Sequence, residues 1–316
     1  MEQTHEALTE EVKHVEVELH EELQKYAEDE DIATIEKSLL QIFSNPDNLV
    51  ENGYSKEVCE MIYNSIEHPN HPNLALLESE EEEKTQEWYF KGYFSRNFIK
   101  QLSLIMQMWK EQAKFPIKFW KLEGFSEENQ NDIMNTRTEG LLEIYKDIKE
   151  KDEESLTKMV EDWLIEIKPR GMWTMLGLRT TTGSQDHLTL PSRGSLLDSF
   201  NALNTPPEKS KSKKIKKPSI LTVGAKALSK HGHRGKEGYW GSITGKESAK
   251  NERANEKALM ILDDCVWINM HVLPHKEYIL EMRVQECYGI RWTDTPTFRG
   301  LLEPQMKDGH EKGWKH

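Results

Sequence analysis

Residues 266–284 read VWINMHVLPHKEYILEMRV, and apolar and polar side chains alternate along both ends of this stretch. Alternation with a period of two is typical of β-strands that bury one face. The apolar faces carry Val266, Ile268, Met270 and Val272 in the first strand, and Tyr278, Leu280, Met282 and Val284 in the second. Matching the two faces predicts an antiparallel hairpin with Val272 opposite Tyr278, because a slip of one residue would bury the polar face.

The other face of this hairpin is expected to be open and rich in polar side chains. The register places Asn269 opposite Glu281, and a third strand over residues 290–293 would put Arg291 beside Arg283. A fourth strand would cover residues 297–302. The complete face carries Trp267, Asn269, His271, Glu281, Arg283 and Arg291. It is either a solvated sheet face or a surface for an anionic ligand, since arginine offers planar paired donors to phosphate and carboxylate.

A loop rich in His, Gly and Arg over residues 231–235 precedes a helix predicted from about 247 to 262. If the protein is an enzyme, His231 or His271 would act as general acid or base, and Glu281 would orient a histidine. The expected ligand-binding residues are Trp267, Asn269, Arg283, Arg291, His233 and Arg234. Two histidine pairs (231 with 233, and 271 with 275) could supply zinc ligands. Pro274, however, prevents residues 271 and 275 from forming a helical pair. We therefore expect no metal and no cofactor.

Apolar residues recur at helical spacing through residues 1–168. The last stripe consists of Leu156, Met159, Val160, Trp163, Leu164 and Ile167. Stripes of this kind predict an array of helices that bury them as a core, and the alternative is a groove for a partner helix.

Charge divides the chain unevenly. Residues 1–168 carry 39 acidic against 18 basic residues, a net charge of −21, whereas the remainder carries +8. The acidic part should repel nucleic acid and the basic part attract it. Residues 209–217 read KSKSKKIKK, which indicates a flexible basic linker, with a nuclear-localisation or nucleic-acid-binding patch as the alternative.

These patterns predict an α+β protein in three segments: an acidic α-helical domain over 1–168, a basic flexible linker over 169–218, and an α+β module over 219–316. The module should combine antiparallel strands with a packed helix. No run of 18 apolar residues occurs, and three scattered cysteines indicate a reducing compartment. We expect a cytoplasmic location, and also a nuclear one if the lysine cluster acts as a localisation signal.

Three segments of the last 98 residues carry a resemblance to a known family. They are LTVGAKALSKHGHR (221–234), YGIRW (288–292) and GHEKGWKH (309–316). The module resembles one found in an uncharacterised family of eukaryotic proteins to which no activity is attached. The resemblance implies a cytosolic or nuclear protein and assigns no site.

Three function classes follow from the sequence. The first is a binding or adaptor protein, whose helical half holds a protein partner and whose sheet face binds an anionic ligand. The second is an enzyme acting on a phosphorylated or nucleotide substrate. The third is an RNA-binding protein that uses the linker lysines and the Arg/Trp face. The adaptor is the favoured interpretation, because no nucleophile–base pair, metal set or phosphate loop stands out, and no membrane contact is expected.

Overall fold

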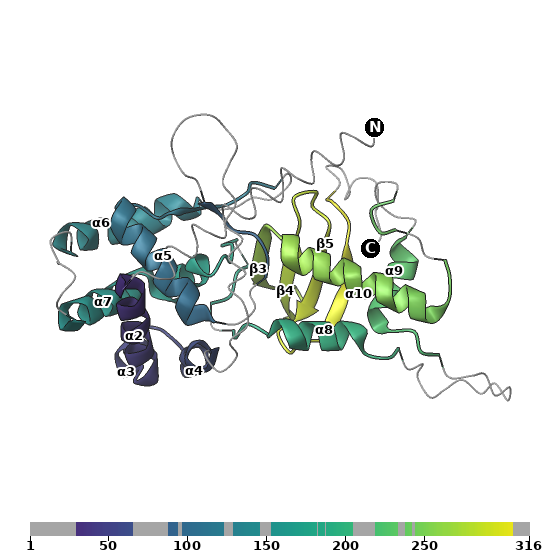
Figure 1. The fold of residues 1–316 in the computed structure, drawn as a ribbon, viewed down its shortest axis with the longest axis horizontal. Coiled ribbons are helices and arrows are strands. Elements are labelled where there is room, and N and C mark those ends of the chain that lie inside the picture. Colours follow the sequence, from purple (N-terminus) through teal and green to yellow (C-terminus); the bar gives the residue numbers. More distant parts are fainter. Residues whose placement is uncertain are drawn as a thin grey trace. The chain divides into compact units, whose positions relative to one another are not determined.

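The structure is a computed structural model. It describes residues 30–65, 88–93, 97–122, 129–145, 153–181, 183–186, 188–204, 219–232, 238–241 and 244–305. The chain divides into two compact units. The first comprises residues 1–91, 96–119 and 129–177, and the second comprises 92–95, 120–128 and 178–316. Figure 1 shows a mainly helical first unit and a sheet with packed helices in the second, which confirms the predicted α+β class.

Helices dominate the described part of the first unit. They are α2 (Glu30–Ser44), α3 (Asp47–Glu51), α4 (Lys56–Asn64), α5 (Phe98–Gln112), α6 (Gln130–Tyr145) and α7 (Glu153–Met175). Two short strands, β1 (Trp88–Tyr89) and β2 (Ile117–Lys118), pair in parallel. Helix α2 packs against α4, α5 and α7, and α6 packs against α7. No helix among the described residues has both the length and the apolar character needed to cross a membrane.

The helical spacing of apolar residues explains the core of this unit. All six residues of the predicted stripe in α7 are buried, and the Trp163 ring lies 5.4 Å from that of Trp109 in α5. Helix α7 kinks at Lys168, whose φ is 64°, because the following Pro169 disfavours helical geometry in the residue before it. The stripe is therefore core, as predicted.

The second unit contains a four-stranded antiparallel sheet in the order β3-β4-β5-β6. Its strands are β3 (Trp267–Val272), β4 (Tyr278–Arg283), β5 (Gly289–Thr293) and β6 (Phe298–Leu302). The predicted hairpin register is confirmed, with Val272 opposite Tyr278 and Asn269 opposite Glu281. The third strand differs, because Arg291 pairs with Glu281 and Gly289 takes the place opposite Arg283. A tight turn at residues 284–288 sets this register through a hydrogen bond from Val284 N to Tyr288 O of 2.9 Å.

Three helices complete the described part of the second unit: α8 (Arg193–Asn201), α9 (Val223–His231) and α10 (Glu247–Asp264). Helix α10 packs against β4 and β5, and α9 packs against α10 and β6. The indole Nε1 of Trp292 donates a 3.1 Å hydrogen bond to the carbonyl of Leu196, which ties β5 to α8. The apolar face of the sheet is thus closed by helices, as the sequence pattern predicted.

Part of the predicted linker is structured. Helix α7 continues to Met175, and Leu178 and Ser184 form bridges with Ile268 and His271 at the outer edge of β3. The nitrogen of Arg179 donates to Ile268 O at 2.7 Å, and that of Gln185 to Met270 O at 2.8 Å. The lysine-rich residues 205–218 lie outside the described part of the chain. Whether the three predicted segments behave as separate domains remains a prediction.

Replacing Trp292 with Ala should destabilise the second unit by about 3–5 kcal/mol, because the side chain is fully buried and bonded to α8. Native-state hydrogen exchange of the β3–β6 amides measures this loss. The control is Arg299→Ala, which removes a half-exposed ion pair with Glu277 and should cost less than about 1 kcal/mol. Equal effects of the two changes would contradict the packing described.

Candidate functional site

The polar face of the sheet is the candidate site. Antiparallel pairing sets Asn269, Glu281 and Arg291 in one row across β3, β4 and β5, with Arg283 opposite Trp267 in the next row. His271 lies on the same face of β3, two residues beyond Asn269. The strands therefore bring together all six residues that the sequence placed on this face.

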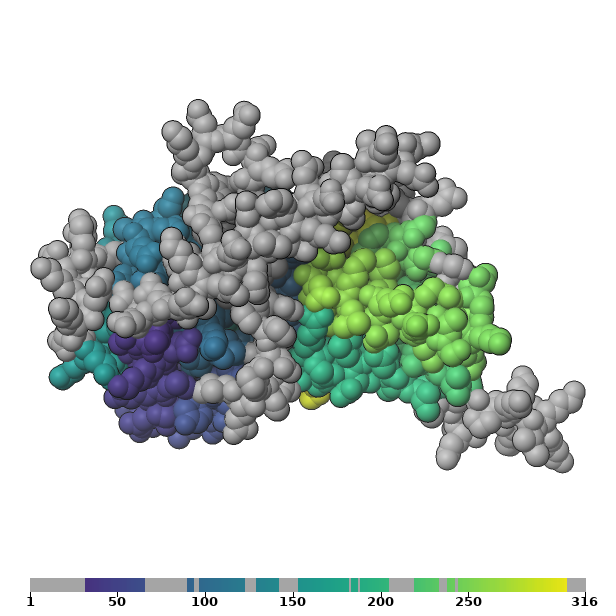
Figure 2. Space-filling view, in the orientation of Figure 1, coloured from purple at the N-terminus to yellow at the C-terminus, as the bar shows by residue number. Residues whose placement is uncertain are grey.

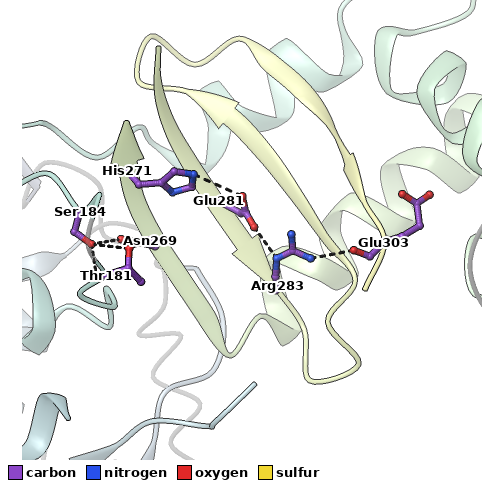
Figure 3. A network of polar contacts seen from close by, with 7 residues as sticks. All are labelled: Thr181, Ser184, Asn269, His271, Glu281, Arg283 and Glu303. Atoms are coloured by element: carbon purple, nitrogen blue, oxygen red, sulfur yellow. Dashed lines mark hydrogen bonds and ion pairs between the residues drawn. The ribbon is translucent and has the colours of Figure 1, made fainter. Parts of the chain in front are cut away.

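A chain of polar contacts runs along this face, as Figure 3 shows. His271 Nε2 lies 3.9 Å from Glu281 Oε2, and Arg283 Nε donates to the other carboxylate oxygen, Oε1, at 2.6 Å. Arg283 Nη1 donates to the carbonyls of Cys287 at 2.6 Å and Glu303 at 3.2 Å. Glu281 thus faces a cation on one side and an imidazole on the other.

Arg283 fixes the position of the Glu281 carboxylate. Its side chain is 6% exposed, and it bonds to one carboxylate and two carbonyls. Gly289 opposite it makes the approach possible, because a Cβ there would lie 2.2 Å from Met282 O and 2.8 Å from Arg283 Cγ. A buried carboxylate needs such a partner, since an uncompensated charge in the interior is costly.

Two polar atoms of the face are buried without a hydrogen-bond partner in the described part of the chain. They are Nδ1 of His271 and Nε of Arg291. A buried donor or acceptor left unpaired costs roughly 1–3 kcal/mol, so native proteins pair nearly all such groups. Such atoms are paired by water, by another part of the chain or by a bound molecule.

Arg291 also has room beside it. It pairs across β5 and β6 with Gly300, and a Cβ built on Gly300 would meet no atom within 4 Å. Arg291 itself is half-buried. The space at Gly300 lies on the backbone opposite Arg291, whose guanidinium carries paired N–H donors of the kind that bind anions.

The protonation of His271 follows from its surroundings. Burial lowers the pKa of His271 below its ordinary value of 6.5; Glu281 raises it in part, whereas Arg291 and Arg283 lower it. The imidazole is therefore neutral at neutral pH. A neutral imidazole next to a carboxylate can accept a proton, and the carboxylate then stabilises the imidazolium.

Two further predicted ligand-binding residues are, like Arg283, held by the rest of the unit. Asn269 is 2% exposed; its Nδ2 donates to Thr181 Oγ1 at 2.7 Å and its Oδ1 accepts from Ser184 Oγ at 2.8 Å. Trp267 is equally buried and packs with Leu122, Val266, Trp120 and Cys287. The face is thus not the open surface expected from the sequence, because residues 178–186 and 120–122 cover part of it.

His231 pairs with a residue that the sequence did not single out. Its Nδ1 lies 2.5 Å from Oε1 of Glu303, which follows β6 directly, and the ring of Trp240 packs edge-on against it at 6.1 Å. Of the three residues expected to converge in an enzyme, observed contacts join only His271 and Glu281. His233 and Arg234 lie outside the described residues. No spacing rule in the sequence singled out Glu303, since it pairs with His231 across 72 residues.

Comparisons with known proteins bear on this unit alone. Residues 209–303 match the family described as the CdiA C-terminal tRNase toxin domain. The match covers less than a third of the chain but includes α9, α10 and all four strands of the sheet. The sequence had suggested only an uncharacterised eukaryotic family, and the match replaces this with a described one. The match does not test whether the protein is eukaryotic. No curated protein and no solved structure matches the chain.

Asn269→Ala should release residues 181–185 from the outer edge of β3, because it removes both side-chain hydrogen bonds that hold them. We expect a loss of roughly 1–3 kcal/mol, measured as faster hydrogen exchange at the Gln185 and Val272 amides. Asn204→Ala, which removes a surface contact with Lys226, is the matched control and should leave those amides unchanged. Unchanged exchange in Asn269→Ala would contradict the role given to this side chain.

Proposed function

We propose that the second unit binds RNA and cleaves its phosphodiester backbone. The observation that carries the proposal is the pair of buried, unpartnered atoms, His271 Nδ1 and Arg291 Nε, on one sheet face with Glu281. The family match over residues 209–303 supports RNA as the substrate, since that family is described as a tRNase toxin domain. Transfer RNA is therefore the first substrate to test.

RNA supplies its own nucleophile for such a reaction. A base accepts the proton of the 2′-hydroxyl, the 2′-oxygen forms a bond to the adjacent phosphorus, and the bond from phosphorus to the 5′-oxygen breaks. The 5′-oxygen leaves with a proton taken from solvent. The products are a 2′,3′-cyclic phosphate and a 5′-hydroxyl, and the protein must accept a proton and stabilise extra charge on the phosphate.

The residues of the face suit these two tasks. His271 is neutral and accepts the proton, and Glu281, 3.9 Å from its Nε2, stabilises the imidazolium. Arg291 binds the phosphate oxygens through its N–H donors. Arg283 acts as a positioning residue, because its hydrogen bond fixes the Glu281 carboxylate. The two arginines thus have different tasks, one toward the substrate and one toward the protein.

The favoured interpretation from the sequence, an adaptor, fits this site less well. Anion binding by Arg291 is common to both functions, but binding alone assigns no task to a neutral histidine beside a carboxylate. A protein partner for the acidic helical half remains a prediction. RNA that binds without being cleaved would bring the function back to the RNA-binding alternative.

His271→Gln should slow cleavage of transfer RNA by roughly 10²–10⁴-fold, the usual contribution of a general base. Arg291→Gln should slow it by roughly 10²-fold, as expected when a donor to the developing charge is lost. The measurement is the appearance of fragments from end-labelled RNA with the full chain. The matched controls are His275→Gln, in the turn between β3 and β4, and Arg299→Gln in β6. Both residues are exposed, and both variants should cleave RNA like the wild type.

Two results would count against this proposal. An RNA with a single 2′-deoxyribose at the cleaved position should resist cleavage there, and equal cleavage would refute attack by the 2′-oxygen. A wild-type chain that neither binds nor cleaves RNA would refute the function itself.

The pH dependence of kcat/KM provides a separate check. His271 must be neutral to accept a proton, so activity should fall as the pH drops through its pKa, which lies below 6.5. Glu281→Gln removes the charge that raises this pKa and should shift the acid limb to still lower pH. An acid limb at or above 6.5, or one that Glu281→Gln moves upward, would contradict His271 as the base.

A further inference from the structure

Helix α10 carries a line of cations along one side. Lys246 at its N-cap, Lys250, Arg253 and Lys257 are spaced by four, three and four residues. Residues at this spacing lie on the same side of an α-helix. At 1.5 Å per residue the line extends about 16 Å along the axis. We call these four residues the basic stripe.

The acidic residues of α10 lie outside the four-residue stripe, although Asp264 follows it on the same side of the helix. Glu252 and Glu256 follow a separate side of the helix and are exposed. Glu247 accepts hydrogen bonds from Ser219 Oγ and Ile220 N, which turn its charge toward residues 219–220. Asp263 pairs with Arg193, and Asp264 lies two turns beyond the end of the stripe. Positive charge is thus concentrated along one flank of the helix.

The cations of the stripe are available to a partner to different degrees. Lys246 is exposed and Lys250 half-buried, and within the described residues neither forms an ion pair. Lys257 lies 4.5 Å from the centre of the Tyr239 ring, and the carboxylate of Glu286 offsets part of its charge. Arg253 donates to the carbonyl of Thr244 and so helps to hold the loop before the helix. Figure 2 shows the α10 segment, in light green, at the surface of its unit.

We propose that the basic stripe is a docking surface for the phosphate backbone of RNA, separate from the sheet face. The inference rests on the proposed function, because charge complementarity alone fits any polyanion. Helix α10 lies behind the sheet as seen from the side of His271 (Figure 3), so one nucleotide cannot touch both surfaces. A folded RNA can reach both, and the stripe then contributes affinity for long RNA and none for a short fragment.

The test is a triple variant of the full chain, Lys246→Gln, Lys250→Gln and Lys257→Gln, with Arg253 kept because it holds Thr244. The control, Lys56→Gln, Lys110→Gln and Lys118→Gln, removes the same charge from the first unit. Affinity for transfer RNA is measured between about 50 and 200 mM salt, and cleavage is measured on a trinucleotide. Each cation bound to phosphate contributes about 0.7–0.9 to the slope of log affinity against log salt.

We expect the stripe variant to lose about 2 units of slope and to bind transfer RNA roughly tenfold or more weakly at about 0.1 M salt. Its cleavage of the trinucleotide should stay within about twofold of the wild type, and the control variant should match the wild type in both measurements. If the wild type binds RNA and the stripe variant has the same salt slope, the stripe is not a docking surface, and the proposed function still stands. If the stripe variant cleaves the trinucleotide more slowly by the same factor as it loses affinity for transfer RNA, the two surfaces are not separate. A wild type that binds no RNA would overturn the proposed function, on which the stripe rests.

Discussion

The ion pair between Arg283 and Glu281 organises the polar face of the sheet. Both side chains are buried, and the 2.6 Å contact between Arg283 Nε and the carboxylate compensates a charge that the interior could not otherwise hold. Arg283 reaches further, to the carbonyls of Cys287 and Glu303, and so connects β4 to the following turn and to the end of β6. With one oxygen of Glu281 engaged in this way, the other is directed to His271.

This constraint divides the polar residues into two groups. Asn269 and Trp267 are fully engaged in holding residues 178–186 and 120–122 on the sheet. His271 and Arg291 each retain a buried atom with no partner among the described residues. Both groups consist of polar or aromatic residues, so composition does not distinguish them. They differ in whether each buried polar atom has a hydrogen-bond partner. The proposal that the second group acts on phosphate in RNA draws on the family match over residues 209–303.

The hairpin of β3 and β4 could be predicted to the residue because strand periodicity leaves one register that buries the apolar face. The pairing of β5 could not, because it depends on the tight turn at residues 284–288, where Cys287 adopts a φ of 65°. The sequence also did not predict that other segments cover part of the polar face. Residues 178–185 have a turn-like composition and no period, yet their backbone continues the sheet beyond β3 and their hydroxyls satisfy Asn269. The partner of His231 was missed for a similar reason, since Glu303 is brought to it only by the packing of α9 against β6.

The claim that His271 and Arg291 together contact RNA, one as base and one as phosphate ligand, is tested most directly by nitrogen NMR of their side chains. The full chain, labelled with ¹⁵N, is titrated with an RNA that carries 2′-O-methyl groups and therefore cannot be cleaved. The account predicts that the Arg291 Nε–H signal and both ring nitrogens of His271 shift with saturation, while those of His275 and Arg299 stay in place. Saturable binding that shifts His275 or Arg299 and leaves His271 and Arg291 unchanged would contradict it.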